Sequence, residues 1–394
     1  PPGLYPDEAM NGNNAQEALD IAPPAGGFKV FYPENFGREG LFINIQTLFI
    51  KEFGHYPWVL RLPSAIFGIL TVLGLYFFAK EAFNKNLALL SALLLATSFW
   101  HINFSRIGFR AIMAPAFLTW GLYFLLHSLN TKRYMLYATA AGLLYGLGFH
   151  SYIAYRATPL LILFVLYFLF KGHLPIRANW RMTFFWFVAS ALIVMAPLGI
   201  NFWSHPADFL GRTAGISVFT SETPLRDLGF NIVKTAGMFN FVGDFNWRHN
   251  VAGRPLLFWP VGIFFLIGIY FSLQKILKEK FTAFPELIIW IWFLSAFLPV
   301  VISNEGIPHA LRSILMAPPI FILSAIGGMK IYELLKPKLS NRLLSIVVYV
   351  FCSLLLFESY VTYFITWGQN QNIKSAFAYN DYVISQYLNS LPKE

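Results

Sequence analysis

The residues best suited to chemistry are two adjacent carboxylates near the start of the chain, in the stretch Tyr5-Pro6-Asp7-Glu8-Ala9. Paired carboxylates at a membrane surface can act as a general base, orient a nucleophile or hold a divalent cation. The competing interpretation is a helix N-cap, because Asp ahead of a helix-forming run is a common helix start. Arginines in other loops favour chemistry, since carboxylates facing guanidinium groups suit a phosphate-bearing lipid substrate.

Three arginines lie in short loops between apolar runs, two of them in Phe104-Ser105-Arg106-Ile107-Gly108-Phe109-Arg110 and the third, Arg156, beside a cluster of aromatic residues. The positive-inside rule disfavours basic residues in these loops, so they require an explanation. A guanidinium group binds two phosphate oxygens at once, which predicts a phosphate site. The alternative is snorkelling of the side chains to lipid headgroups.

A third candidate lies late in the chain, where His309 and Arg312 follow Pro308. Their spacing of three predicts that both lie on one face of a helix that begins near Pro308. The free N–H groups of such a helix start would also attract an anion. An ordinary loop with one basic cap and a surface histidine is the simpler alternative.

A polar segment at residues 243–250 combines amide, carboxylate, imidazole and indole groups, in Asp244, Asn246, Trp247, Arg248 and His249. An aromatic platform with hydrogen-bonding partners is typical of sugar sites, because sugars have apolar faces and hydroxyl rims. A polar loop resting on a membrane would have the same composition.

The elements that must position these residues are membrane spans. Hydrophobic residues make up 57% of the chain and charged residues 12%, where a soluble protein carries about 25% charged residues. The net charge of +10 does not indicate a nucleic-acid partner, because the basic residues stand mainly in short loops between apolar runs. The single cysteine, Cys352, excludes a disulfide framework. Nucleotide-binding and protease motifs such as Walker A, GxGxxG, GxSxG and HExxH are absent from the sequence.

A membrane core about 30 Å thick requires roughly 20 helical residues per span. This window predicts spans near 60–79, 87–104, 112–127, 134–153, 157–171, 182–203, 255–277, 285–303, 313–331 and 344–366. The third and fifth are short, which predicts that they are tilted, re-entrant or packed inside the bundle. The fold class expected is therefore an all-α polytopic transmembrane bundle.

Lysine and arginine are concentrated in alternate loops, which predicts the orientation of the spans. The loops after the first, third, fifth, seventh and ninth spans hold Lys80, Lys85, Lys132, Arg133, Lys171, Arg177, Arg181, Lys275, Lys278, Lys280, Lys330, Lys336, Lys338 and Arg342. The positive-inside rule places these loops in the cytoplasm and all four candidate segments outside. We therefore expect a multi-pass protein of the plasma (inner) membrane whose active site faces the periplasm or the cell exterior.

Three regions follow from this topology. Residues 1–59 form an outer loop with the acidic motif and interfacial helices, and residues 60–366 form the bundle, with a large outer loop at 204–254. Residues 367–394 are expected to be an outer tail or the start of an outer domain. Because the chain begins without Met, we expect a first span to be missing ahead of it.

In its motifs and their order the chain resembles the GT-C membrane glycosyltransferases, in the branch of the dolichyl-phosphate-mannose protein mannosyltransferases and the lipid A aminoarabinose transferase. The motifs are Tyr5-Pro6-Asp7-Glu8-Ala9, Gly37-Arg38-Glu39-Gly40-Leu41-Phe42, Leu60-Arg61-Leu62-Pro63-Ser64-Ala65, Phe104-Ser105-Arg106 and Pro308-His309-Ala310-Leu311-Arg312. Members of this branch often carry a His-Pro-Pro type stretch after the acidic motif, where this chain has Glu39-Gly40-Leu41-Phe42. The resemblance therefore leaves the subfamily and the acceptor open.

The resemblance implies an inverting glycosyltransferase that takes a sugar from a polyprenyl-phosphate carrier and transfers it to a protein, lipid or glycan acceptor outside the cell. Asp7 maps to the catalytic position, with Glu8 second. The resemblance implies that basic residues hold the donor phosphate, and the positions here that could do so are Arg106, Arg110, Arg156, His309 and Arg312. The sugar or acceptor is expected to contact Glu39, Asp244, Asn246, Trp247, Arg248 and His249.

No cofactor is expected, and a divalent metal is the alternative. Related oligosaccharyltransferases use a divalent metal, but Asp7-Glu8 without a strong third outer carboxylate favours a metal-free site. A flippase or transporter for polyprenyl-linked sugars and a non-catalytic envelope scaffold are the alternatives. A transporter would require charges at mid-membrane depth along a path, whereas here the spans are nearly free of charge, apart from Glu358 in the last one, and the candidate site residues gather on one face.

Overall fold

The computed structural model describes residues 3–21, 27–171, 179–210 and 213–391. It consists almost wholly of helices, as the sequence predicts. The two strands are β1 (Phe31–Tyr32) and β2 (Arg38–Glu39), which pair antiparallel. The α-helices are α1 (Pro6–Asp20), α2 (Leu41–Phe53), α3 (Pro57–Ala82), α4 (Lys85–Ala96), α5 (Phe99–Arg106), α6 (Met113–Ser128), α7 (Tyr134–Gly148), α8 (Pro159–Phe170), α9 (Trp180–Ser204), α10 (Pro206–Leu210), α11 (Thr213–Ile216), α12 (Pro224–Gly237), α13 (Trp259–Glu279), α14 (Phe284–Val301), α15 (Ala317–Leu335), α16 (Asn341–Tyr360), α17 (Gln371–Ala376) and α18 (Tyr379–Ser390).

Each predicted span coincides with a helix, except the one near 87–104, which coincides with the two helices α4 and α5. Among the described residues, eight helices are long and apolar enough to cross a membrane, or nine if the bent pair α4 and α5 forms one span. That pair bends by 60° at Thr97-Ser98, which the hydropathy of the segment does not indicate. Helix α7 matches the fourth predicted span but is only 15 residues long. Arg177 of the basic loops lies outside the described residues.

Local sequence signals define where these helices begin. Proline occupies the first turn of several of them, such as Pro57 in α3, Pro159 in α8 and Pro260 in α13. Proline suits this turn because its missing N–H would have no intrahelical partner there. At the start of α4 the side chain of Asn84 accepts a hydrogen bond from the Leu87 N–H at 3.0 Å, which satisfies one of the free donors of the first turn.

Helices α6 and α15 form the centre of the bundle. The apolar window of α15 is 83% buried and that of α6 is 78% buried, against 17% for α16 and 28% for α9 and α13. The short third span is therefore packed inside the bundle, which is one of the predicted alternatives. Helices α13 and α15 approach each other closely at Gly268. A Cβ there would lie 1.8 Å from the carbonyl oxygen of Leu323, so only glycine fits at this position. Such close contact of small residues is a common way for membrane helices to pack.

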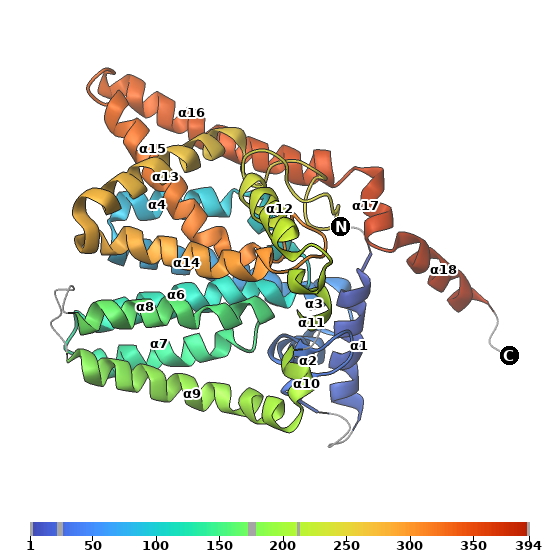
Figure 1. The fold of residues 1–394 in the computed structure, drawn as a ribbon. Helices are drawn as coiled ribbons and strands as arrows, with labels where there is room; N and C mark the ends of the chain where they lie inside the picture. Colours follow the sequence, from blue (N-terminus) through green and yellow to red (C-terminus); the bar gives the residue numbers. More distant parts are fainter. Residues whose placement is uncertain (1–2, 22–26, 172–178, 211–212, 392–394) are drawn as a thin grey trace.

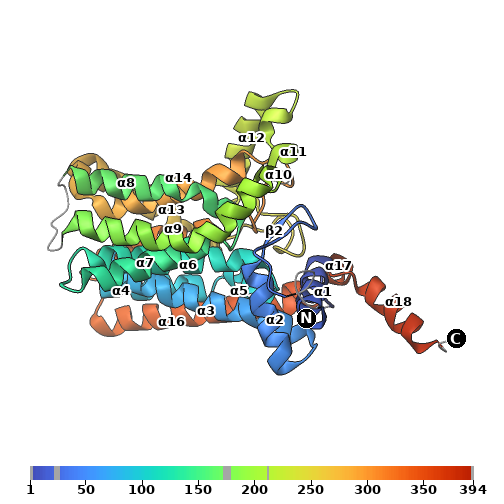
Figure 2. The same ribbon diagram turned by 90° about the horizontal axis from the view of Figure 1, so that it is seen from below.

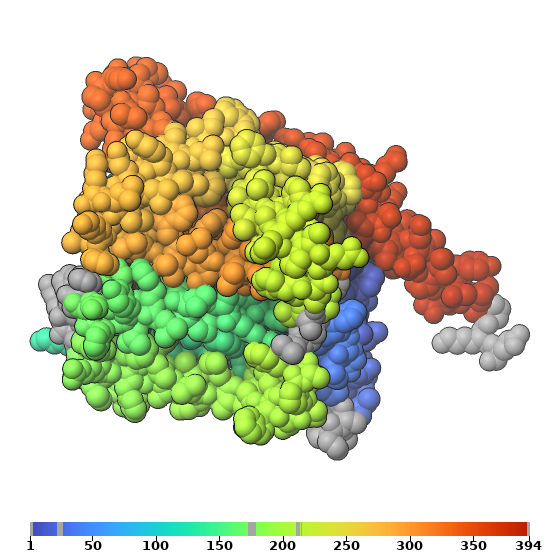
Figure 3. Space-filling model, viewed as in Figure 1, coloured from blue at the N-terminus to red at the C-terminus, as the bar shows by residue number. Residues whose placement is uncertain are grey.

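The segments that hold the candidate residues gather at one end of the bundle. Both ribbon views place α1, α2, α10, α11, α12, α17 and α18 at this end, where both termini also lie (Figures 1 and 2). The space-filling view shows α12 covering part of this end and α18 extending beyond the body (Figure 3). The described residues of the basic loops lie at the opposite end, as the alternation of charges predicts.

Two segments outside the predicted spans contain helices. The loop at 204–254 includes α12, and the tail after Trp367 folds into α17 and α18. Helix α12 is unusual because its polar Asn231 is buried while Leu225 and Val233 are exposed. Asn231 donates hydrogen bonds to the carbonyl oxygens of Val301 and Ser303 at 3.1 and 3.2 Å. These contacts hold the Asn231 side of α12 against the end of α14.

Candidate active site

The acidic motif forms the first turn of α1. Tyr5 is the N-cap, and its N–H donates a hydrogen bond to Glu8 Oε2 at 3.0 Å. The Glu8 carboxylate is fully buried and binds Arg61 of α3 at two points, Nε to Oε1 at 2.7 Å and Nη2 to Oε2 at 2.9 Å. It also accepts the Gly108 N–H at 2.8 Å. Glu8 therefore joins α1, α3 and the loop after α5.

Asp7 lies in a different environment from its neighbour. It is half-buried and lines a large cavity. Its Oδ1 accepts a hydrogen bond from Asn35 Nδ2 at 3.0 Å. The pKa of the Tyr5 phenol is raised, first by burial and then by the Asp7 charge. The Arg248 guanidinium lies 4.1 Å from the centre of the Tyr5 ring. Tyr5, Asp7 and Arg248 all line the same cavity.

The cavity has a volume of about 640 Å³ and collects most of the predicted residues. Its wall includes five carboxylate residues and four arginines, which are Asp7, Glu39, Asp208, Asp244, Glu305, Arg110, Arg156, Arg248 and Arg312. Asn246, His249 and His309 line it as well. The structure thus brings together side chains from segments that are far apart in the sequence.

Three predicted residues lie elsewhere. Glu8 is enclosed behind the wall, as described above. Arg106 is exposed and faces a second cavity of about 1000 Å³ between α1, α3 and α18, beside the Tyr363 ring. Trp247 does not line the main cavity, and its carbonyl oxygen accepts a hydrogen bond from the Trp367 indole at 2.7 Å.

Glu39 holds two of the predicted phosphate-binding arginines. Its buried carboxylate accepts hydrogen bonds from Arg110 Nε at 3.1 Å and from Arg156 Nη2 at 3.2 Å. The side chains of Arg110 and Arg156 remain 23% and 18% exposed, so part of each guanidinium group faces the cavity. Glu39 therefore orients donors toward the space where an anion could bind.

The hairpin that carries Glu39 depends on two glycines. Gly37 has a φ of +88°, a conformation that L residues with a Cβ rarely adopt. A Cβ at Gly40 would lie 2.0 Å from the Lys29 carbonyl oxygen. Between them, Arg38 is buried and donates to the side-chain oxygens of Asn11 and Asn14 at 2.6 Å each. The motif 37–42 thus fixes Glu39 against α1.

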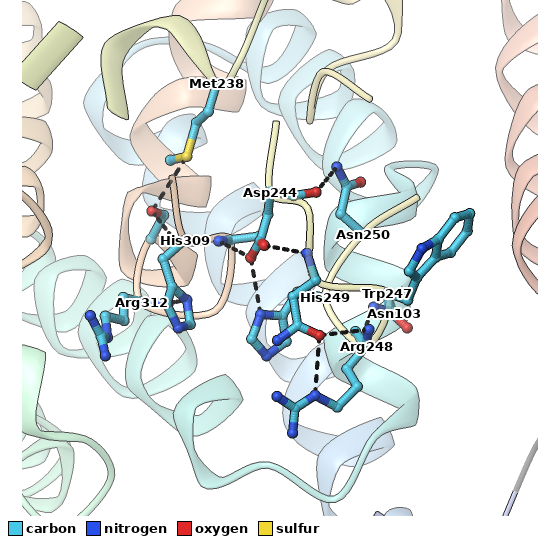
Figure 4. A network of polar contacts seen from close by, with 12 residues as sticks. Asn103, Met238, Asp244, Trp247, Arg248, His249, Asn250, His309 and Arg312 are labelled. Atoms are coloured by element: carbon cyan, nitrogen blue, oxygen red, sulfur yellow. Dashed lines mark hydrogen bonds and ion pairs between the residues drawn. The ribbon is translucent and has the colours of Figure 1, made fainter. Parts of the chain in front are cut away.

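A second polar network surrounds Asp244 (Figure 4). Asp244 Oδ2 accepts hydrogen bonds from His249 Nδ1 at 3.0 Å and from the Ala310 N–H at 2.8 Å. Its Oδ1 accepts the Asn246 N–H at 2.7 Å. The rings of His249 and His309 lie next to each other, with their centroids 4.8 Å apart. This network joins the 244–249 segment to the 304–312 segment.

The predicted helix start near Pro308 is wrong. Residues 310–313 form turns, and α15 begins only at Ala317, after a short 3₁₀ segment at Ile314–Met316. His309 and Arg312 nevertheless lie close together, because the Arg312 N–H donates to His309 Nδ1 at 3.4 Å. The guanidinium group of Arg312 binds Glu305, with Nη2 2.9 Å from Oε2. A tight turn therefore produces the proximity that we expected from a helix.

Sequence reasoning gave no site role to Tyr5, Arg61, Tyr152 or Glu305. Arg61 had a usable signal, because a charged residue inside an apolar span is rare and generally paired. Tyr152 lies between Arg110 and Arg312, and burial raises the pKa of its phenol despite both arginines. Tyr5, Tyr152 and Glu305 lie within four residues of predicted site residues in the sequence, but their residue types alone gave no indication of a role.

A third, smaller cavity of about 280 Å³ adjoins the main one. Arg156, Arg312 and Tyr152 line both cavities. Apart from these, its wall is largely apolar, with Phe209, Leu298, Pro299 and Ile302. Arg156 and Arg312 thus lie where this smaller, largely apolar cavity (the apolar slot) meets the main cavity (the polar chamber).

Comparison with known proteins agrees with this architecture. Residues 41–200 match the model of the dolichyl-phosphate-mannose-protein mannosyltransferase family. No curated protein matches the sequence significantly. The comparisons with solved structures find similar folds at low sequence identity, which supports conclusions about the fold alone.

Three of these structures are the following. The archaeal oligosaccharyltransferase AglB from Archaeoglobus fulgidus, in complex with an inhibitory peptide and a dolichol-phosphate, is 18% identical with a TM-score of 0.56, covering 93% of this chain and 52% of that chain. The Archaeoglobus fulgidus oligosaccharyltransferase tethered to an acceptor peptide is 19% identical with a TM-score of 0.52, covering 93% and 50%. ArnT from Cupriavidus metallidurans, bound to undecaprenyl phosphate, is 17% identical with a TM-score of 0.53, covering 90% and 61%.

This chain therefore spans about half the length of the archaeal oligosaccharyltransferase chains that it matches. The resemblance seen in the sequence motifs is confirmed: the chain has the fold of the GT-C membrane glycosyltransferases, and its residues 41–200 match the protein mannosyltransferase family model.

Proposed function

We propose that this protein is an inverting glycosyltransferase that moves a sugar from a polyprenyl-phosphate carrier to an acceptor on the outer face of the plasma membrane. The observation that carries the proposal is that Asp7 shares one cavity with Arg110, Arg156 and Arg312. A carboxylate that can take a proton and cations that can hold a departing phosphate are the two requirements of this transfer.

The donor phosphate would bind at Arg156 and Arg312, with Arg110 and His309 beside them. These two arginines line both the polar chamber and the apolar slot. A phosphate held between them would place the sugar in the chamber and the first isoprene units against Phe209, Leu298 and Ile302. The guanidinium fork suits this role because it binds two phosphate oxygens at once.

Asp7 would act as the general base. The acceptor hydroxyl gives its proton to the Asp7 carboxylate while its oxygen attacks the anomeric carbon. The bond between that carbon and the phosphate oxygen breaks, and the polyprenyl phosphate leaves with its charge stabilised by the arginines. Attack from the side opposite the leaving phosphate inverts the configuration at the anomeric carbon.

Two other carboxylates of the motifs take supporting roles in this proposal. Glu8 positions Asp7, because it fixes the first turn of α1 to Arg61 and Gly108. Glu39 positions Arg110 and Arg156. Asn246 and Arg248 face the chamber and are the residues we assign to the sugar or acceptor. The backbone of Trp247 holds the Trp367 indole.

The outer location rests on the positive-inside rule. The segments whose residues line the cavity lie at the end of the bundle opposite the described basic loops, and such loops are generally cytoplasmic. Partners at the site would be the lipid-linked donor and a protein, lipid or glycan acceptor. Among the described residues, the charged side chains of the site line one cavity at one end of the bundle, whereas a transporter of charged lipids would use a path of charges through the membrane.

The test is sugar transfer by the purified full-length protein from a panel of polyprenyl-phosphate sugars. We expect the wild type to consume one donor and release polyprenyl phosphate, and Asp7→Asn to lose about 10²- to 10⁴-fold in rate. The matched control is Asp20→Asn, the same change at an exposed position of the same helix. Equal rates for Asp7→Asn and wild type would overturn the assignment of Asp7. Tight donor binding with no turnover of any donor would overturn the enzyme.

A further inference from the structure

Glu358 is a carboxylate inside the last predicted span, where such a group is costly and is often functional. Its side chain is 12% exposed and binds Arg254, which ends the site segment, residues 244–254. The site segment supplies Asn246 and Arg248 to the main cavity. We propose that Glu358 is a positioning residue that holds the site segment in place for the sugar or acceptor. This inference rests on the proposed function and adds a residue to it.

Glu358, Arg254 and Thr362 form a closed triangle of hydrogen bonds. Arg254 donates from Nη2 to Glu358 Oε1 at 2.7 Å and from Nη1 to the Thr362 hydroxyl at 2.6 Å. The Thr362 hydroxyl donates in turn to Glu358 Oε1 at 2.8 Å. Because residues four apart lie on one face of a helix, both partners of the guanidinium group come from the same face of the last span. Two bound nitrogens fix the plane of the guanidinium group as well as its position.

A second contact joins the site segment to the last span. The indole N–H of Trp367 donates to the Trp247 carbonyl oxygen at 2.7 Å, and the Trp367 side chain is buried. The segment is therefore held at Trp247 and at Arg254. The cavity residue Arg248 lies between these two points and directly follows the first of them.

The shape of the last span makes both contacts possible. Helix α16 continues into a π-helical segment, Val361–Trp367, and the Gly368 N–H bonds to the Tyr363 carbonyl oxygen five residues back, at 3.0 Å. Thr362 and Trp367 are also five residues apart, a spacing that separates side chains by about 140° around an α-helix. The wider π turn reduces this angle, because its hydrogen bonds close at five residues instead of four. Both side chains therefore face the site segment.

The site segment depends on these anchors because it contains no helix or strand of its own. Its internal bonds connect its two ends. The Gly253 N–H donates to the Asp244 carbonyl oxygen at 3.0 Å, and Asn250 Nδ2 contacts the same oxygen at 3.2 Å (Figure 4). Asn250 Nδ2 also contacts the Arg254 carbonyl oxygen, at 2.6 Å. Displacement of Arg254 would therefore also displace Asp244, which lines the main cavity.

Glu358 acts through the site segment and does not meet the substrate. Among the described residues, those that line the main cavity include neither Glu358 nor Arg254, which border a separate, much smaller pocket. Asn246 Oδ1 accepts both the N–H and the Nε–H of Arg248, at 3.0 and 3.1 Å, so these two residues move together. We expect Glu358 to control the fit of the sugar or acceptor. The donor phosphate site should be unaffected, because its arginines come from other segments.

The first experiment measures amide hydrogen exchange of the full-length protein in detergent. Glu358→Gln removes the charge and Thr362→Val removes the hydroxyl, and both keep the shape of the side chain. Each should speed exchange in the site segment roughly 10- to 100-fold, as expected for the loss of a charged hydrogen bond. Glu286→Gln is the matched control, because it breaks a similar pair, with Lys275 Nζ 2.8 Å from Glu286 Oε1, at the opposite end of the bundle. It should leave exchange in the site segment unchanged.

Two results of this experiment would overturn the positioning role. One is exchange in the site segment that stays as in wild type for both Glu358→Gln and Thr362→Val. The other is exchange that rises equally throughout the chain, because Glu358 would then stabilise the whole fold and not this segment. Exchange does not depend on turnover, so it decides whether Glu358 holds the site segment even if the protein transfers no sugar and the proposed function fails.

The second experiment uses the donor that wild type consumes. Glu358→Gln should raise the KM for the acceptor roughly tenfold or more and leave the Kd for free polyprenyl phosphate unchanged. The charge-swapped double variant, Glu358→Arg with Arg254→Glu, should recover part of the loss because it restores the ion pair. Equal losses of acceptor and lipid affinity in Glu358→Gln would contradict an effect that is confined to the site segment.

Discussion

The carboxylate of Glu8 forms a two-point ion pair with the guanidinium group of Arg61, 53 residues away in the sequence, with contacts of 2.7 and 2.9 Å. The Glu8 side chain is 0% exposed and that of Arg61 10% exposed. The pair is thus removed from water, and each charge depends on the other for its solvation. Because Asp7 precedes Glu8 on the same turn, this contact also determines that Asp7 faces the cavity.

Arg61→Ala should destabilise the protein strongly. Removal of one partner leaves a buried carboxylate without its countercharge, which costs about 3–5 kcal/mol. Thermal unfolding of the detergent-purified protein measures this loss. Arg106→Ala is the matched control, because Arg106 is exposed, and surface substitutions usually change stability by less than about 0.5 kcal/mol. Similar unfolding temperatures for the two variants would contradict the structural role of the Glu8–Arg61 pair.

The spans were predictable because hydropathy reports directly on membrane burial. The predicted spans near 60–79 and 182–203 lie within α3 and α9, which are longer by a few residues at one or both ends. Hydropathy did not predict the bend between α4 and α5, which lies at Thr97 and Ser98. Thr97 accepts the Ser359 hydroxyl on its carbonyl oxygen, a partner 262 residues away. Hydropathy carries no information on such contacts.

The site was predictable as a set of loop residues but not as a set of contacts. Unusual arginines in short loops pointed to Arg110 and Arg156, and the cavity contains both. Their shared partner Glu39 lies 71 and 117 residues from them in sequence. A sequence without its fold cannot distinguish a carboxylate that meets substrate from one that holds arginines. For the same reason the different environments of Asp7 and Glu8 were not foreseeable.

Glu39→Gln should strengthen the binding of free polyprenyl phosphate. The Glu39 carboxylate competes with phosphate for Arg110 and Arg156, and amide substitution removes that competing charge while keeping the shape. A charge a few ångströms away contributes several kcal/mol at an effective dielectric constant of about 20, so a tenfold gain in affinity is a conservative expectation, equal to about 1.4 kcal/mol. Isothermal titration with a short-chain polyprenyl phosphate measures it.

Glu34→Gln is the matched control for this change. Glu34 is a carboxylate of the same hairpin whose side chain is 43% exposed, 3.7 Å from Arg38. Its loss should leave lipid binding unchanged. Weaker binding by Glu39→Gln would show that the carboxylate is needed to hold the arginines in place more than it competes with the lipid.

Arg312→Lys should lower kcat/KM for the lipid donor although it keeps the positive charge. Lysine cannot reproduce the planar fork that binds Glu305 and would bind phosphate. Loss of one charged hydrogen bond corresponds to about 1.5–3 kcal/mol, or roughly 10- to 100-fold in kcat/KM for the lipid donor. Arg226→Lys on α12 is the control, because Arg226 is exposed at the same end of the molecule. Equal effects of the two substitutions would argue against a phosphate contact at Arg312.

The free energy of unfolding should fall as the pH rises above about 10, because of two partly buried phenols of the site, Tyr5 and Tyr152. Burial raises the pKa of Tyr5 and of Tyr152 above the ordinary value of 10.0. Below that value both phenols are protonated in the folded and unfolded states, so they add no pH dependence. As the pH rises past 10.0, the unfolded chain ionises first, and this favours unfolding. Thermal unfolding of wild type between pH 8 and pH 11 should therefore decline at the alkaline end.

The double variant Tyr5→Phe and Tyr152→Phe should lose part of this alkaline decline, because phenylalanine has no proton to release. Tyr56→Phe is the control, since Tyr56 is exposed and lies outside the site. If the double variant keeps the full slope of wild type, the alkaline loss comes from other groups. Tyr32, whose phenol is also buried and has a raised pKa, is then the next residue to change.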